Sequence, residues 1–263
     1  MGHAALFPLL LLIARSASGG GWFSPPGPAP AVTACLHPDC RDDCSDCTPA
    51  EVTTALKGST AVGDPATSWT VQLNAANALV ELLDTPAAPA HRAVIASMGG
   101  IEALLAVTDA TLEVQPKTEI ATGGSEEQIS QLLVQLITAL GRLSIDNSHI
   151  QASIAAQGGI KKITRAMSVG HHRYSDSELV TQSCWALAQL GKNNLPNQKA
   201  IVGDGAVKFA ERAINNREGR TGYCRNLIDV VRLAARALGV EVGVKPDYPR
   251  TDMAAGMLGS QEL

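Results

Sequence analysis

The feature that most constrains this chain is a helix-period hydrophobic pattern that occurs several times. Its clearest copy spans Leu179 to Ala213, where an apolar run ends near Leu190. A polar break follows, then a short segment, a glycine turn at Gly203 to Gly205, and a further apolar run from Val207. Apolar residues three and four apart predict amphipathic helices. The stretch is therefore expected to form three successive helices.

Other parts of the chain match this pattern at corresponding positions. The shared positions are an Ala-Leu pair, an isoleucine, and a glycine turn followed by an apolar residue. They are Ala78-Leu79, Ala139-Leu140, Ala186-Leu187 and Ala237-Leu238; Ile95, Ile154 and Ile201; and Gly99-Gly100-Ile101, Gly158-Gly159-Ile160 and Gly205-Ala206-Val207. The distance from the alanine to the residue after the turn is 23, 21 and 21 residues, whereas successive pairs lie 61, 47 and 51 residues apart. A constant internal distance with variable outer spacing indicates a structural repeat with loop insertions.

These copies resemble the armadillo repeat family, in which three helices make a unit of about 40–47 residues. The likeness covers roughly residues 70–240. It implies an all-α fold, a right-handed superhelix of about three to four three-helix repeats. HEAT repeats are the nearest alternative, and the glycine turn followed by an apolar residue favours armadillo units.

The repeated positions have a physical explanation. Glycine permits the positive φ or the close packing that a sharp turn between helices needs. Small side chains at the four alanines let neighbouring helices approach, and leucines fill the shared core. The alanines are Ala78, Ala139, Ala186 and Ala237, and the added leucines are Leu82, Leu143 and Leu190. Stacking of units is then the source of stability, and the end units need polar covers.

Composition and charge narrow the function. Of 263 residues, 45% are apolar and 3% aromatic, which suits stacked helices. The net charge of −4 provides no basic stripe, so nucleic acid is not an expected partner. Phosphate-binding loops and nucleophile or metalloprotease motifs are absent from the sequence. We therefore expect a protein that is not an enzyme and has no cofactor.

The chain divides into four parts. Residues 1–18, with an apolar run followed by small residues, resemble a signal peptide, and residues 19–47 form a Gly/Pro-rich linker with a Cys-rich segment. Residues 48–240 form the repeat domain, and residues 241–263 a disordered tail. This predicts a location in the secretory pathway without a membrane span after signal removal. A plastid reached through a signal-plus-transit leader is the alternative.

Cysteines suggest a further feature. Cys35, Cys40, Cys44 and Cys47 fall close together, and in an oxidising compartment they predict two disulfides of open connectivity. In a reducing compartment, four thiolates, or three with His37, could hold zinc instead. A metal-binding or redox module carried on the helices is thus the alternative function. Cys184 and Cys224, inside helical patterns, are expected to be buried thiols, and His171-His172 to lie in a solvated loop.

The resemblance also implies a binding surface. In armadillo proteins the long helix that carries the Ala-Leu pair lines a concave groove that holds extended peptides. The matching positions are Asn74, Asn77, Glu81, Gln135, Thr138, Arg142, Gln182, Trp185, Gln189 and Arg236, followed by Val240. Importin-α-like members carry Trp and Asn there, and this chain keeps only Trp185, so basic nuclear-import cargo is not expected. The sequence predicts a non-catalytic scaffold for a protein segment, against the alternative that these residues form a solvated helix face.

Overall fold

A computed structural model describes residues 47–59, 65–113, 126–171, 177–216 and 221–240. All of them belong to one compact unit, Ala31–Leu263. Within these ranges the secondary structure is helical and contains no strand, so the expected all-α class is confirmed. The predicted signal peptide, nearly all of the Cys-rich segment and the C-terminal tail lie outside the described residues.

The helices follow the three-part pattern read from the sequence. The long helices are α3 (Pro65–Leu82), α7 (Glu126–Ser144), α10 (Ser177–Gly191) and α13 (Thr221–Ala237). The short helices are α4 (Ala88–Ser97), α8 (Ser148–Ala156) and α11 (Leu195–Gly203). The remaining helices are α2 (Pro49–Ser59), α5 (Gly100–Glu113), α9 (Gly159–Val169) and α12 (Ala206–Asn216).

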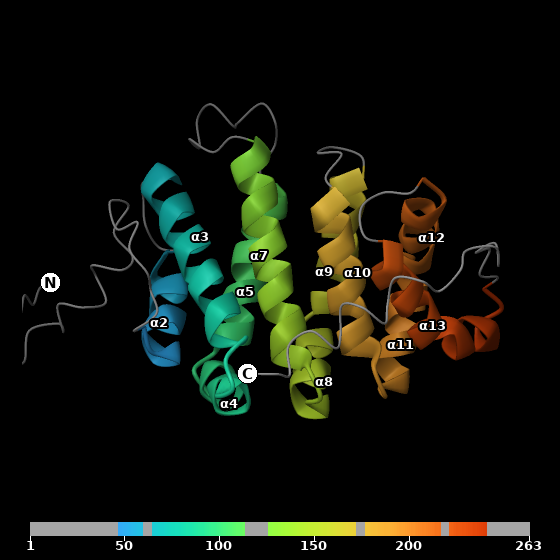
Figure 1. Ribbon diagram of the computed structural model, residues 1–263, viewed down its shortest axis with the longest axis horizontal. Coiled ribbons are helices and arrows are strands. Elements are labelled where there is room, and N and C mark those ends of the chain that lie inside the picture. Colours follow the sequence, from blue (N-terminus) through green and yellow to red (C-terminus); the bar gives the residue numbers. More distant parts are fainter. Residues whose placement is uncertain (1–46, 60–64, 114–125, 172–176, 217–220, 241–263) are drawn as a thin grey trace, which may run out of the picture. The chain divides into compact units, whose positions relative to one another are not determined.

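Two rows of helices pack against each other. In the first row α3 contacts α7, α7 contacts α10, and α10 contacts α13 (Figure 1). In the second row α2 contacts α5, α5 contacts α9, and α9 contacts α12. The rows are joined by contacts such as those of α5 with α7 and of α9 with α10. Each helix of these two rows thus contacts the next helix of its own row.

Three of the four Ala-Leu pairs predicted to lie in the core are buried. The Ala-Leu pairs at 78, 139 and 186 are buried, and Ile95, Ile154 and Ile201 have no exposed surface. The prediction that the fourth pair is buried is wrong, because Ala237 is exposed and Leu238 is 49% exposed. Ala234 and Ala235 are buried in α13 instead. The helix ends at Ala237, and Gly239 has a φ of 69°, so the pair lies where the stack has already ended.

The predicted glycine turns adopt the backbone that requires them. Gly99, Gly158 and Gly205 have φ values of 75°, 76° and 82°. The residue that follows differs between turns. A Cβ on Gly100 would lie 2.8 Å from the carbonyl oxygen of Ile95, and the same overlap occurs between Gly159 and Ile154. In the third turn the residue after the positive-φ glycine is Ala206, and the turn accommodates the alanine side chain.

Buried amides join α8 and α11 to the ends of the long helices. Gln151, 3% exposed, donates from Nε2 to the carbonyl oxygens of Gln189 (3.0 Å) and Ser144 (3.3 Å). Asn194 donates to Gln151 Oε1 at 3.2 Å, and its own Oδ1 accepts from the backbone N–H of Asn197. Asn147 caps α8 in the same way, through the N–H of Ile150. These side chains satisfy backbone groups that a helix end leaves unpaired.

The α4 helix makes a different junction. Its preceding residue, Ala87, has no side-chain cap, and His91 Nδ1 lies 2.9 Å from the carbonyl oxygen of Leu82. Arg92 donates to the carbonyl oxygen of Ile145 at 3.3 Å. Burial lowers the pKa of the Arg92 guanidinium, and nearby Asp146 opposes this effect. The guanidinium therefore ties α4 to the turn between α7 and α8.

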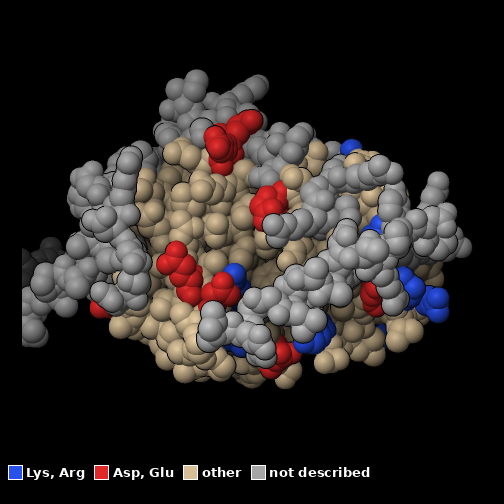
Figure 2. Space-filling model, in the orientation of Figure 1, with Lys and Arg blue, Asp and Glu red and all other residues tan. Residues whose placement is uncertain are grey.

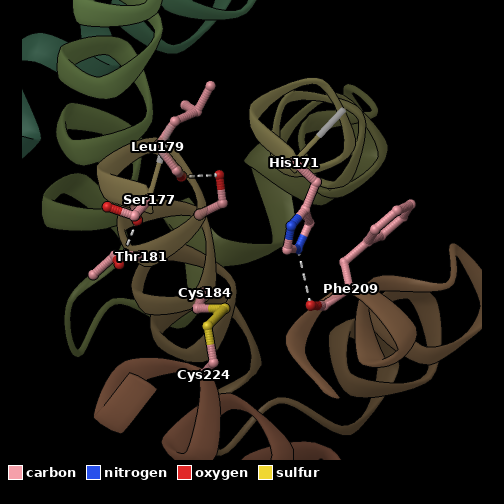
Figure 3. The surroundings of a disulfide bond; sticks show 8 residues. His171, Ser177, Leu179, Thr181, Cys184, Phe209 and Cys224 are labelled. Carbon is pink, nitrogen blue, oxygen red and sulfur yellow. Dashed lines mark hydrogen bonds between the residues drawn. A yellow bond between two sulfur atoms is a disulfide. The ribbon is translucent and has the colours of Figure 1, made fainter. Parts of the chain in front are cut away.

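Two expectations about side chains near α10 are wrong. Cys184 and Cys224 are not separate thiols but form a disulfide between α10 and α13, with their Cα atoms 4.8 Å apart (Figure 3). His171 is half-buried and not in a solvated loop, since its Nε2 lies 3.1 Å from the carbonyl oxygen of Phe209 and its ring stacks on that phenyl group. Disulfides are typical of oxidising compartments.

The terminal helix α13 has a charged outer flank. Val230 faces Gly191 of α10, where a Cβ on the glycine would approach Val230 Cγ1 to 3.0 Å. Arg225, Arg232 and Arg236 have spacings of seven and four residues, which place them on one side of the helix, turned away from α10. We refer to these three residues as the arginine flank. The same helix also exposes the apolar side chain of Leu233 (74%), so its outer surface is only partly charged.

No single described helix has both the length and the apolar character needed to cross a membrane. The consecutive helices α4 and α5 meet these criteria only as a pair, with a 75° bend at their junction.

Candidate functional site

The long helices α3, α7 and α10 bring nine of the ten predicted binding residues onto neighbouring elements. Spacings of three and four residues place them on one side of each helix. They are Asn74, Asn77 and Glu81 on α3; Gln135, Thr138 and Arg142 on α7; and Gln182, Trp185 and Gln189 on α10. Seven of them are half-exposed, Glu81 is exposed and Thr138 is 8% exposed. We call these nine residues the long-helix face.

Trp185 is held in place by a glycine on the neighbouring helix. A Cβ on Gly141 of α7 would lie 2.9 Å from Trp185 Cε3 and 3.0 Å from the Cβ of Ala186. The absent side chain therefore provides the space in which one part of the indole packs. The rest of the ring is half-exposed at the contact between α7 and α10.

Several polar groups of the face already bond to residues outside the face. Arg142 pairs with the carboxylate of Asp84 and donates to the carbonyl oxygen of Val80 at 3.4 Å, so it bridges α7 and α3. Thr138 donates its hydroxyl proton to the carbonyl oxygen of Val134 at 2.7 Å. Gln182 donates from Nε2 to Glu178 at 2.7 Å. These contacts fix the side chains in position before any ligand binds.

The tenth predicted residue, Arg236, does not join this group. Two contacts set the level of α13 beside α10, namely the Cys184–Cys224 disulfide and the approach of Val230 to Gly191. In both contacts the residue of α13 has a number about 40 higher than the residue of α10, and the numbers increase in the same direction along the two helices. The helices are therefore parallel. Arg236 therefore lies beyond the end of α10 and belongs to the arginine flank.

Asn226 lies on α13 at about the level of Trp185 and is a candidate for the position that Arg236 was expected to fill. It is half-buried, it lies close in level to Trp185, and the core residues Leu227 and Val231 lie on another side of α13. The sequence did not indicate it, because the Ala-Leu pair used to align α13 is two turns or more further along. The disulfide is the observation that identifies Asn226.

The surface over α3 and α7 is mostly uncharged. Figure 2 shows this region as a broad neutral area with acidic groups around it. Among the predicted residues the only acid is Glu81, and the only base on these three helices, Arg142, is paired with Asp84. The face therefore carries no excess of basic charge.

The predicted Cys-rich site falls almost entirely outside the described residues. Only Cys47 is described, and it is 9% exposed at the start of α2. Two disulfides or a zinc site at Cys35, Cys40, Cys44 and Cys47 remain alternative predictions. In the described ranges, no three His, Cys, Asp or Glu side chains gather in a way that could hold a metal ion.

No protein-family model, curated protein or solved structure matches this chain. The case for its function therefore rests on its own residues.

Proposed function

We propose that this protein is a non-catalytic scaffold that binds an extended protein segment on the long-helix face. In this proposal the helices form an armadillo-like right-handed superhelix of three to four units. The observation that carries the proposal is the alignment of half-exposed amides and one tryptophan along three packed helices. A side-chain amide both donates and accepts hydrogen bonds, so it can pair with peptide main chain of any sequence.

Features of the helix rows support the armadillo-like assignment. The pattern of long, short and intermediate helices recurs, and each glycine turn has a positive φ. The long helices pack in chain order, as successive solenoid units do. A face shared by successive units suits an extended ligand, because each unit can contact the next few residues of the peptide.

We further propose that the protein enters the secretory pathway. The apolar run and small residues at the N-terminus support this location, and a disulfide between α10 and α13 suits an oxidising lumen. Sequencing the N-terminus of the mature protein from its native source checks the proposal. An N-terminus shortly after residue 18 is expected, and an uncleaved Met1 would contradict it.

Affinity purification with matched variants tests the binding function. The wild type is compared with a Trp185→Ala/Gln189→Ala double variant, which removes the ring and one amide from the face. A Lys161→Ala/Lys208→Ala variant changes exposed residues on α9 and α12 and serves as the control. Partners recovered by the wild type and by the control should be lost with the face variant.

Equal recovery by all three proteins would exclude the long-helix face as the binding surface. Thermal unfolding must show that the variants retain the wild-type fold. Trp185 is half-exposed and Gln189 is bonded only through its backbone carbonyl in the contacts described above, so both substitutions should be tolerated.

A further inference from the structure

We infer that the occupant of the long-helix face is an uncharged extended segment with one apolar side chain that packs on Trp185, and that Asn226 is a fourth amide contact. This inference rests on the proposed binding function and adds to it the chemistry of the ligand. It depends on three observations, namely the packing of Trp185, the pairing of charges within the protein, and the spacing of amide side chains along the long helices.

The first observation concerns Trp185, which we call the anchor because the apolar side chain of the ligand is proposed to pack on it. Trp185 is the single aromatic residue among the predicted binding positions, and Gly141 fixes one part of its ring. A ring that is already immobilised loses little conformational entropy when a ligand packs on it. Buried aromatic side chains of this kind are preferred energetic centres of binding surfaces. The exposed remainder of the indole offers an apolar surface to one side chain of the ligand.

The second observation concerns charge. Arg142, the one basic residue of the long-helix face, is compensated within the protein by its ion pair with Asp84. A charged ligand group would have to displace one of these partners or be desolvated without compensation. Gln182 is oriented by Glu178 and presents an amide, not a charge, to the face. A neutral segment avoids both costs.

The third observation concerns spacing. Packed helices lie about 8–10 Å apart, and an extended chain advances about 3.3 Å per residue. The face therefore offers one long helix for about every three residues of ligand. With Asn77 on α3, Gln189 on α10 and Asn226 on α13, amides are available on both sides of the anchor. These amides suit main-chain groups, which leaves the identity of the flanking residues open.

Selection from a display library of random dodecapeptides on the purified wild-type protein tests this inference. We expect enriched peptides to share one apolar residue flanked by uncharged residues. Their affinity should fall about tenfold or more with Trp185→Ala, as for a central aromatic anchor. It should fall about fivefold with Asn226→Ala, the loss of one hydrogen bond. The Lys161→Ala/Lys208→Ala variant should bind as the wild type does.

The outcomes separate this inference from the proposed function. Enriched peptides that are rich in Lys, Arg, Asp or Glu and still need Trp185 would overturn the neutral ligand while the binding function stands. Unchanged affinity with Asn226→Ala, in a variant of wild-type thermal stability, would remove Asn226 from the surface. No enrichment on the wild type, or equal enrichment on the Trp185→Ala/Gln189→Ala variant, would overturn the proposed function itself.

Discussion

The contact between α7 and α10 and the contact between α10 and α13 join similar helices by different means. In the first, α7 buries a series of large residues that includes Leu133, Leu136 and Leu140, and Gly141 receives the indole of Trp185. In the second, α13 buries both large residues, such as Leu227 and Val231, and small ones, such as Ala234, and a disulfide crosses the contact. Helices inside a stack are stabilised from both sides by packing, whereas the terminal helix has one neighbour in its row and a covalent link.

The largest effect should come from breaking the covalent link. In the Cys184→Ser/Cys224→Ser variant we expect a loss of about 3–4 kcal/mol in the free energy of unfolding, because the bond closes a loop with a sequence separation of 40 residues. Guanidinium titration measures this loss, and hydrogen exchange should show it first in α13. The wild type treated with reductant under unfolding conditions should match the variant. Equal stability of oxidised and reduced protein would contradict the structural role of the bond.

A smaller loss is expected from the amide that joins α8 to the end of α10. Gln151→Ala removes the hydrogen bonds to the backbone carbonyls of Ser144, Gln189 and Lys192 and leaves the side-chain amide of Asn194 without its acceptor. Since unsatisfied buried polar groups cost about 1–3 kcal/mol, we expect a loss of about 2 kcal/mol by denaturant titration. His149→Ala on the exposed side of α8 is the control. If both variants are equally stable, the amide contributes nothing to the internal contact.

The smallest effect should come from filling the space beneath Trp185. Gly141→Ala places a methyl group against the indole and the Cβ of Ala186, so we expect a loss of about 1 kcal/mol from overpacking. Gly58→Ala in α2 meets no atom within 4 Å and should stabilise the protein by up to about 1 kcal/mol. Thermal unfolding measures both changes. A gain in stability with Gly141→Ala would show that the indole moves freely.

The comparison also explains what the sequence could predict. The glycine turns and the three buried Ala-Leu pairs depend on residues close in sequence, and each has a local signature. The disulfide and the contact between Gly141 and Trp185 join residues 40 and 44 positions apart, and neither cysteine nor glycine signals its distant partner. Because the sequence does not show how α13 is placed beside α10, the alignment of the Ala-Leu pairs assigned Arg236 to the long-helix face, although Arg236 lies beyond the end of α10. The expected ligand contacts stay predictions, because they depend on a molecule that the sequence does not contain.

A stack of helices ends in an exposed side that could accept another stack. At the α13 end of the described helices, that side carries the arginine flank, in which Arg232 pairs with Asp229. Two copies that met through this side would bring guanidinium groups of equal sign together and would have to strip them of water. The charge on the last helix thus opposes end-to-end association at this side, much as inward-facing lysines keep the edges of β-sheets from joining.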